Sequence, residues 1–344
     1  MKFLNKITLL IVLICFGGCK TSKTVVVQEK EDGVFTIAFG SCNKHTVKNN
    51  LWDDILATNP DVWIWGGDIV YADTGDAQKI KGMYDIQRSI AGYSELMAKV
   101  PIIGTWDDHD YGLNDGGVEF SSKKESQQVF LDFLDVPQES PRRSQEGVYT
   151  SSTYDMPNGS VKILVLDTRY FRSSLTKAKE DGKRYGPGVY GEGTVLGTEQ
   201  WAWLEKELNE STADFNILIS SVQFLSNEHG FECWGNFPHE VDKLKEVVKA
   251  SNAKGVIILS GDRHISEFSV DEVGGMSYPL IDFTSSGLTH VYSSYSGEPN
   301  PYRIGEVVAT KSFGVVQLNL KSKEASLKMI GDNGEILNSL TQKY

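Results

Sequence analysis

The fold is indicated most clearly by residues 62–71, which read Val-Trp-Ile-Trp-Gly-Gly-Asp-Ile-Val-Tyr. Four bulky apolar residues with no polar residue between them are typical of a strand that is buried on both faces. Two glycines end this strand, and Asp68 and Tyr71 follow within five residues. In open α/β sheets, ligands bind where strands end, so this stretch predicts an α/β fold with a polar site at a sheet edge.

Other apolar runs of the same kind extend this prediction along the chain. Residues 34–39, 102–103, 161–166, 215–219 and 256–259 are predicted as further strands. Helical stretches lie between them, and strands that alternate with helices indicate the α/β class. After Asp271 the sequence changes to loops rich in Gly, Ser and Tyr and to alternating strands such as 313–320. We expect these to complete the same domain with antiparallel strands.

Three of the helices can be placed from local patterns. Ser122 followed by Glu125 resembles a capping box that begins a helix, and Pro137 is expected to end it. Residues 200–208 and 241–248 repeat apolar side chains at helical spacing, which predicts two amphipathic helices.

Composition and charge exclude several classes of protein. The chain has 344 residues, of which 40% are hydrophobic and 23% charged, and this excludes a disordered chain, a coiled coil and a protein with many membrane spans. The 34 basic residues are outnumbered by 46 acidic ones, so the net charge is −12. Such a surface repels polyanions, and specific nucleic-acid binding is therefore not expected. The oligomeric state is left open.

Residues 1–19 are interpreted as a lipoprotein signal peptide. Lys2 and Lys6 precede an apolar run over residues 7–16, which is about half as long as the ~20 residues that a membrane-spanning helix needs. The run leads into Phe-Gly-Gly-Cys, which is similar to a lipobox, so Cys19 is the expected site of lipidation. An ordinary cleaved signal peptide is the alternative.

This interpretation divides the chain into a signal peptide, a tether and a folded domain. Residues 20–33 are polar and are predicted to be a tether, and residues 34–344 are predicted to be the folded domain. We expect an exported lipoprotein of the bacterial cell envelope, in the periplasm or on the outer membrane, held to the membrane by its N-terminal lipid.

Polar side chains follow five of the predicted strands. Because the carboxyl ends of parallel strands share one sheet edge, we expect these side chains to gather there. So many carboxylates would repel one another unless cations neutralised them. Oxygen donors with some imidazole and one thiol suit hard to borderline metal ions better than soft ones. The donors at the strand ends are Cys42, Asn43, Asp68, Tyr71, Asp107, Asp108, His109, Gln223, Asp262 and His264.

Six motifs together resemble the PhoD-like (alkaline phosphatase D) branch of the calcineurin-like metallophosphoesterases. They extend over residues 35–320 and occur in the family's order. The motifs are Phe39-Gly40-Ser41-Cys42, Pro60-Asp61 with Gly67-Asp68-Ile69-Val70-Tyr71, Thr105-Trp106-Asp107-Asp108-His109-Asp110-Tyr111, Leu166-Asp167-Thr168-Arg169-Tyr170, Leu196-Gly197 with Gln200 and Trp203-Leu204, and Ser260-Gly261-Asp262-Arg263-His264.

The resemblance implies both a fold and a reaction. The fold is two packed mixed β-sheets flanked by helices, a four-layer αββα sandwich. The reaction is metal-dependent hydrolysis of phosphate mono- or diesters, in which a hydroxide held between metal ions attacks phosphorus. The alternative is a catalytically silent lipoprotein that binds phosphorylated ligands. A serine hydrolase and a zinc protease are disfavoured, because neither Gly-x-Ser-x-Gly nor His-Glu-x-x-His occurs.

The resemblance also implies the ligands of an Fe³⁺ ion. Asp68 is expected to bridge two metal ions, and Tyr71 and Cys42 to bind the iron. A tyrosine loses its proton near neutral pH only beside a strongly Lewis-acidic cation, which favours Fe³⁺ over Zn²⁺. A disulfide between Cys42 and Cys233 is the competing interpretation, because thiols of exported proteins tend to pair.

A second metal ion, of the Ca²⁺ type, is implied beside the iron. Asp108 and Asn114 are its expected ligands, although the choice among Asp107, Asp108 and Asn114 stays open. Asp262 and His264 are expected to close the site. Asp262 stands where the wider superfamily has a histidine, which raises the oxygen content in favour of Ca²⁺.

Further roles follow from the same comparison. His109 is expected to act with Asp68 in catalysis, by protonating the leaving oxygen or stabilising the transition state. Gln223, Arg169 and Arg263 are predicted to bind substrate, although an ion pair with an aspartate is an equally good interpretation of either arginine. Residues 229–239 are suggested as a wall of the substrate pocket. The remaining histidines, at 45, 229, 239 and 290, are expected on the surface or in loops.

Overall fold

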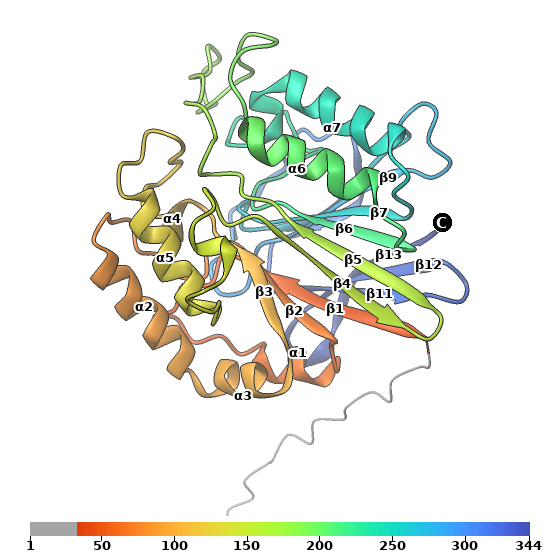
Figure 1. The fold of residues 1–344 in the computed structure, drawn as a ribbon, viewed down its shortest axis with the longest axis horizontal. Helices are drawn as coiled ribbons and strands as arrows, with labels where there is room; N and C mark the ends of the chain where they lie inside the picture. The colour runs from red at the N-terminus through yellow and green to blue at the C-terminus, as the bar shows by residue number, and fades with distance from the viewer. Residues whose placement is uncertain (1–32) are drawn as a thin grey trace, which may run out of the picture.

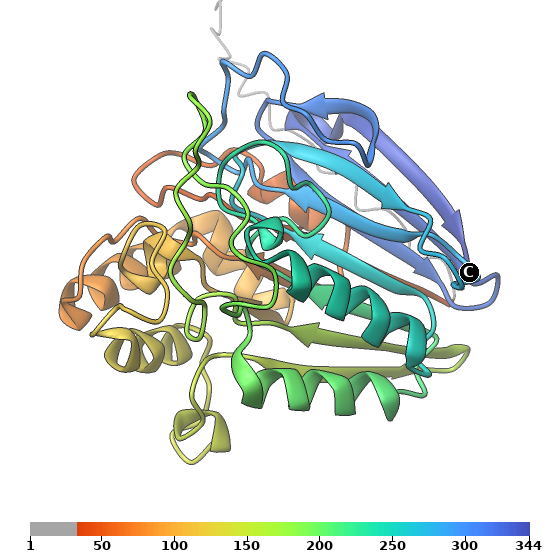
Figure 2. The same cartoon turned by 90° about the horizontal axis from the view of Figure 1, so that it is seen from above.

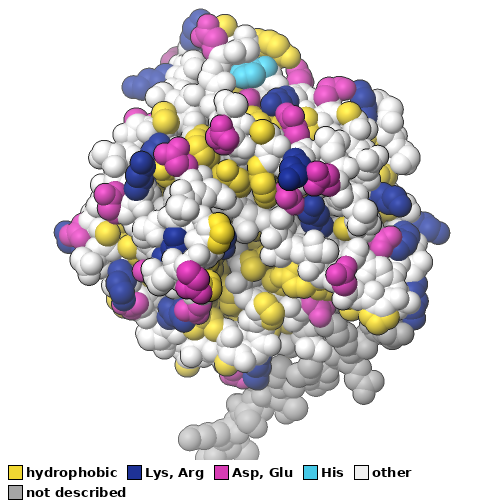
Figure 3. All heavy atoms as spheres, in the orientation of Figure 1, with side chains coloured by type: hydrophobic (Ala, Val, Ile, Leu, Met, Phe, Trp, Pro, Cys, Tyr) yellow, Lys and Arg dark blue, Asp and Glu magenta, His cyan; other side chains and the backbone are white. Residues whose placement is uncertain are grey.

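The computed structural model describes residues 33–344 and shows two β-sheets packed face to face between layers of helices (Figure 1). The predicted signal peptide, Cys19 and residues 20–32 of the predicted tether lie outside the described residues. Within residues 33–344, no helix is long and apolar enough to cross a membrane. Acidic and basic side chains are intermingled on the face seen in Figure 3.

The first sheet has six strands in the order β13-β12-β11-β1-β2-β3. Its members β1, β2 and β3 are parallel, and β11 joins β1 in the antiparallel direction. The carboxyl ends of β1, β2 and β3 therefore lie at one edge. The strands are β1 (Val34–Gly40), β2 (Val62–Gly66), β3 (Ile102–Thr105), β11 (Phe313–Asn319), β12 (Glu324–Ile330) and β13 (Ile336–Lys343).

The second sheet has seven strands in the order β10-β8-β9-β7-β6-β5-β4. Its centre, β5, β6, β7 and β9, is parallel, and the outer strands are antiparallel. The strands are β4 (Thr150–Met156), β5 (Gly159–Val165), β6 (Phe215–Ile219), β7 (Val256–Ser260), β8 (Ser266–Asp271), β9 (Leu280–Ser285) and β10 (Arg303–Val308). Apart from β9, which pairs in parallel with β7, the strands after Asp271 are antiparallel to their neighbours, as expected.

Helices cover the outer face of each sheet. Figures 1 and 2 show α6 and α7, in green and teal, side by side over the second sheet, whereas α1, α2, α3 and α5 cover the first. The helices are α1 (Trp52–Ala57), α2 (Ala77–Ser89), α3 (Ala91–Lys99), α4 (Asp108–Tyr111), α5 (Lys123–Phe133), α6 (Gly197–Asn209) and α7 (Pro238–Ala250), with 3₁₀ turns η1 (Pro141–Arg143), η2 (Trp234–Asn236) and η3 (Asp332–Gly334). The expected four-layer arrangement is confirmed.

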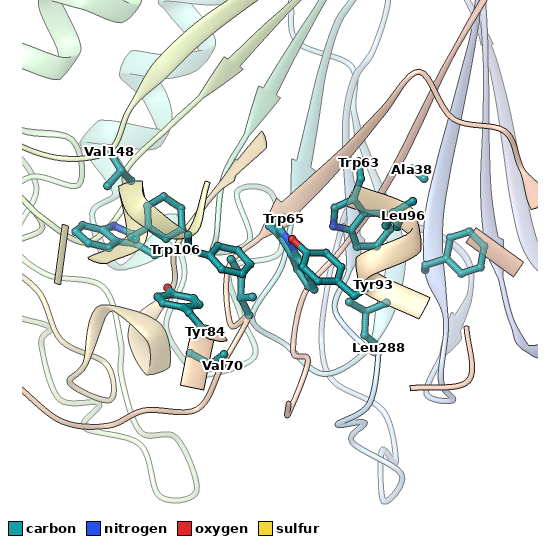
Figure 4. Packing of buried hydrophobic residues seen from close by; sticks show 14 of the residues in the cluster. Ala38, Trp63, Trp65, Val70, Tyr84, Tyr93, Leu96, Trp106, Val148 and Leu288 are labelled. Atoms are coloured by element: carbon teal, nitrogen blue, oxygen red, sulfur yellow. The ribbon is translucent and has the colours of Figure 1, made fainter. Parts of the chain in front are cut away.

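Strand β2 shows why its sequence is apolar throughout. Val62 and Ile64 pack in the core between the two sheets, and Trp63 and Trp65 pack on the opposite face against the helices. In Figure 4, Trp65 meets Tyr93 of α3, and the indole Nε1 donates a hydrogen bond to the Tyr93 hydroxyl at 3.0 Å. Both faces of the strand are dry, so neither can carry a charged side chain without a large cost.

The predicted start of α5 is confirmed, but its capping box and its predicted end are wrong. Ser122 is the N-cap residue, but its backbone at φ −92°, ψ 13° is not extended, and its side chain makes no capping hydrogen bond. The helix ends at Phe133, before Pro137. Asp135, with φ 54°, turns the chain into a left-handed conformation before the proline is reached.

Candidate metal centre

The loops that leave β1, β2 and β7 bring the two sheets together at one point. Cys42, Asp68, Asp262 and His264 all have positive φ angles, of 57°, 53°, 69° and 57°. Such conformations are uncommon for residues other than glycine and concentrate at functional sites. The Cys42 sulfur lies 3.6 Å from Asp68 Oδ2 and 3.5 Å from the carbonyl oxygen of Asp262. One loop of the first sheet thus touches a loop of the second.

Two groups of possible metal ligands adjoin each other here. One consists of Asp68, Asp108 and His109, and the other of Asp107, Asp108 and Asp262. In each group, one ligand atom from every residue lies within 4.8 Å of the others. Because Asp108 belongs to both groups, the arrangement has room for two neighbouring cations.

Several buried oxygens at this point have no hydrogen-bond partner within residues 33–344. They are Asp68 Oδ1, Tyr71 Oη, Asp107 Oδ2 and Asp108 Oδ1. Buried polar atoms in proteins almost always have a partner, so four orphaned oxygens in one cluster require an explanation. Bound cations would provide it, and a set of carboxylate and phenol oxygens beside one thiol fits hard to borderline metals.

The acid–base properties of the cluster lead to the same conclusion. Burial raises the pKa of Asp68 well above its usual range, and burial is also the main cause that raises the pKa of Asp107 to about 8. Burial and the neighbouring Asp107 raise the pKa of Asp262 to about 8, and burial raises the pKa of the Cys42 thiol. For Asp108, burial is outweighed by the charges of Arg169 and His109, which lower its pKa. A cation would reverse the upward shifts.

A row of aromatic rings borders the carboxylates. The His109 ring lies 4.1 Å from the Tyr71 ring, and the His290 ring lies 5.6 Å from Tyr71 and 4.2 Å from His264, measured between centroids. The His264 Nδ1 donates to the His290 carbonyl oxygen at 3.0 Å, and the His290 N–H donates to the Cys42 carbonyl. His290 lies in a loop and is exposed, as expected, and these contacts also make it part of the site.

His290 could have been found from the strand that precedes it. Residues 280–285 form β9, which pairs in parallel with β7. The carboxyl end of β9 therefore shares its edge with the carboxyl end of β7, five residues before His290. The sequence after Asp271 predicts loops and antiparallel strands. Neither the parallel strand β9 nor the role of His290 is therefore evident from it.

Two aspartates that had no predicted role position the predicted ones. Asp73 accepts a hydrogen bond from His109 Nδ1 at 2.7 Å, which leaves Nε2 for another partner. Asp110 accepts the backbone N–H groups of Asp68, Ile69 and Asp107 at 3.3, 3.2 and 2.6 Å. Asp110 thus clamps the loop after β2 to the loop after β3.

The three predicted substrate-binding side chains are engaged within the protein. Arg169 is fully buried and forms ion pairs with Asp107 and with Glu232. Its interpretation as a phosphate ligand therefore gives way to the ion-pair alternative.

The other two side chains also have partners within the protein. Arg263 is also buried and binds both carboxylate oxygens of Glu298 at 2.9 Å. Gln223 is 1% exposed, and its amide donates to Glu267 and Thr284. Both amide hydrogens of Gln223 are engaged in these contacts, whereas Arg263 Nε is buried without a hydrogen-bond partner within residues 33–344, so the phosphate-binding role of Arg263 stays a prediction.

Asn114 is exposed, and its expected role as a metal ligand stays a prediction. Cys42 and Cys233 are both buried and free, so the disulfide alternative is wrong. Within residues 229–239, which are suggested as a pocket wall, Trp234 is buried in the core beside Trp201 of α6, at 6.2 Å between ring centroids, whereas Gly230, Phe231 and Asn236 line a hollow.

Comparison with known proteins places this geometry in a family. A model of PhoD-like phosphatases matches residues 37–289. Alkaline phosphatase D of Bacillus subtilis (strain 168) is 25% identical over 275 residues, which are 67% of this chain and 46% of that protein. The chain therefore spans about half the length of this curated relative.

Solved structures agree at the level of the fold. A structure of PhoD superposes with a TM-score of 0.69 at 20% identity and covers 91% of this chain and 70% of that one. GAP50, described as the anchor in the inner membrane complex of Plasmodium, superposes with a TM-score of 0.60 at 13% identity, covering 91% of this chain and 89% of that one. The arrangement of two packed sheets is thus shared.

Proposed function

The chain belongs to the PhoD-like phosphatase family, and on this premise we propose that it hydrolyses phosphate esters at the candidate metal centre. The observation that carries the proposal is the pair of ligand groups that share Asp108 and include orphaned buried oxygens. An acidic protein attracts an anionic ester only where cations reverse the local field, and the centre has the donors to hold them.

The proposal assigns Fe³⁺ and Ca²⁺ to this centre. Cys42, Asp68 and Tyr71 would hold the iron, because burial raises the pKa of the Tyr71 phenol and only a strong Lewis acid overcomes that shift. Asp108, Asp262 and His264 would hold the second ion, for which oxygen donors suit Ca²⁺. When bound, such ions supply an acidified water and neutralise charge on phosphate oxygens.

The side chains around the centre would handle the proton. With Nδ1 held by Asp73, the His109 imidazolium can give the proton on Nε2 to the leaving oxygen. Asp73 fixes the orientation of the ring through this contact. Tyr71 and His290 are part of the row of rings that borders the centre beside His109.

The location of the protein is a separate part of the proposal. A positive start, a short apolar run and the lipobox-like ending at Cys19 support an exported envelope lipoprotein. Mass spectrometry of the mature N-terminus would then find acyl chains on Cys19. An unmodified N-terminus at any other residue would contradict the anchor.

Metal analysis combined with two chromogenic substrates tests the activity. The purified protein should contain iron and calcium and should release nitrophenol from p-nitrophenyl phosphate, its bis ester or both. A chelator should abolish the release, and the two metals together should restore it. Tight binding of phosphate without turnover of either ester would instead support the catalytically silent alternative, which family membership does not favour.

A further inference from the structure

A hollow that is separate from the candidate metal centre lies between two loops. Its volume is about 330 Å³, and residues 176–187 form one wall and residues 227–236 much of the other. The loops are fastened together, because the Gly230 carbonyl accepts the N–H groups of Arg184 and Tyr185 at 2.8 and 2.9 Å. We call this hollow the basic pocket, after Lys177, Lys179 and Lys183 in its lining.

The basic pocket adjoins the metal centre on two sides. The Tyr185 hydroxyl donates to Asp115 Oδ2 at 2.7 Å, and the Asp115 N–H donates to Asp108 Oδ2 at 2.6 Å. On the other side, Phe231 lies under the guanidinium of Arg263 at 4.2 Å, and Arg263 is the neighbour of Asp262 in sequence. Two hydrogen bonds, both made by Asp115, therefore link a wall of the pocket to the candidate metal ligand Asp108.

The charge of the pocket is unusual for so acidic a chain. Its lining contains three lysines and only two acidic residues, Glu180 and Glu228. Lys183 is paired with Glu180 at 2.9 Å. Lys177 and Lys179 are exposed and form no ion pair within residues 33–344. Two ammonium groups are therefore free to meet an anion at this place.

We propose that the basic pocket binds a second negatively charged group of the substrate. The preferred ester would then have a leaving group that carries an anion of its own, such as a second phosphate. Lys177 and Lys179 would contact that anion, and the rings of Tyr185 and Phe231 would line the carbon skeleton between the two charges. This inference rests on the proposed function, because it places the reacting phosphate at the metal centre.

Two substrates that differ by one phosphate test the proposal in the complete, metal-loaded protein. Phosphate release is measured from glycerol phosphate and from glycerol bisphosphate. The wild type should show a kcat/KM at least tenfold higher on the bisphosphate. The double variant Lys177→Gln, Lys179→Gln should lose most of that preference through KM and keep its rate on glycerol phosphate. The matched control is Lys206→Gln, Lys254→Gln, which removes two exposed lysines elsewhere and should change neither rate.

Other outcomes would overturn the proposal. Equal kcat/KM on both esters in the wild type would contradict it, and so would an equal loss on both in the double variant. If added free phosphate stimulated the hydrolysis of glycerol phosphate, the pocket would bind an anion that is not part of the substrate, and this would contradict the proposal. If no ester is hydrolysed, calorimetric binding still decides: tighter binding of the bisphosphate that the double variant loses supports the pocket although the enzymatic proposal fails, and equal binding contradicts it.

Discussion

Tyr71 is the residue whose surroundings say most about the metal. Its hydroxyl is buried without a hydrogen-bond partner, and burial beside Cys42 and Asp68 raises its pKa. A neutral phenol in that position would leave both its donor and its acceptor unused, which is costly. A ferric ion bound by the Tyr71 oxygen would remove this cost and would give the protein a visible charge-transfer colour.

We therefore predict that Tyr71→Phe abolishes the colour and lowers the iron content. The visible spectrum and metal analysis measure both effects. Tyr93→Phe is the matched control, because it removes another buried hydroxyl, one that contacts Trp65 instead of the centre. The control should keep the colour. A colourless, fully active wild type that contains only zinc would refute the iron assignment.

The contact between Asp73 and His109 gives a second prediction. Asp73→Asn keeps an acceptor for Nδ1 but removes the negative charge beside the ring. We expect kcat to fall by roughly 10²-fold on esters with a basic leaving group, and much less on p-nitrophenyl phosphate, whose leaving group needs little protonation. Asp76→Asn, at the start of α2, is the control. Equal losses on both kinds of ester would mean that Asp73 does not act through proton transfer.

Single residues show how far the sequence could be interpreted. Cys42, Asp68 and Asp262 could be assigned to one site from the sequence, because each closely follows an apolar run that is typical of a buried strand. Arg169 could not be assigned, because a guanidinium suits a phosphate and a carboxylate equally well. Only the structure shows that Glu232, far away in the sequence, supplies one of its partners.

Among the elements, the sequence located buried strands well and edge strands poorly. Strands β1, β2, β6 and β7 lie within one residue of their predicted bounds, because continuous apolar runs leave little choice. Strand β4 (Thr150–Met156) went unnoticed. It is an edge strand of mostly polar, half-exposed residues, and its pairing with β5 decides its conformation.

The turn after β2 is the element on which the site depends most closely. Gly67 has φ 93°, and a Cβ atom there would collide with the Cβ of Asp107 and lie 2.8 Å from its backbone nitrogen. The close approach of two backbones is what brings Asp68 next to the loop after β3. A side chain at this position would push the two loops apart.

Gly67→Ala should therefore weaken both the fold and the centre. We expect a loss of about 1–3 kcal/mol in the free energy of unfolding, together with lower metal content. Gly82→Ala is the matched control, because it lies in α2 with open space around its Cα and should stabilise the helix by about 0.5–1 kcal/mol. Denaturant unfolding and metal analysis measure the effects. Normal metal content in Gly67→Ala would show that the turn does not position Asp68.

In the molecule as a whole, the two sheets share both a core and a site. Apolar residues of both sheets form one continuous cluster between them, and the loops at one edge of that cluster carry the carboxylates. The position of each carboxylate is thus fixed by packing that extends through the protein. Packing of the core offsets the unfavourable free energy of holding these charges close together. Cations bound at the edge would reduce this unfavourable free energy.

This coupling predicts that removal of metal destabilises the protein more as the pH rises. In the metal-free protein the pKa of Asp107 and that of Asp262 are raised to about 8, so the folded state binds protons that the unfolded state releases near pH 4. Their contribution to stability is therefore complete below pH 4 and is lost as the pH rises to 8. A chelator should lower Tm only slightly at pH 5 and by roughly 5–10 °C at pH 8.5.

Calorimetry with and without chelator at both pH values tests this expectation. In Asp262→Asn one of the two groups cannot ionise, so the metal-free variant should depend less on pH than the metal-free wild type. Asp181→Asn, at an exposed position, should behave as the wild type does. The metal-free carboxylates ionise and repel one another only above their raised pKa, so the chelator effect should be larger at pH 8.5 than at pH 5. An effect of equal size at both pH values would show that cations do not hold these carboxylates together.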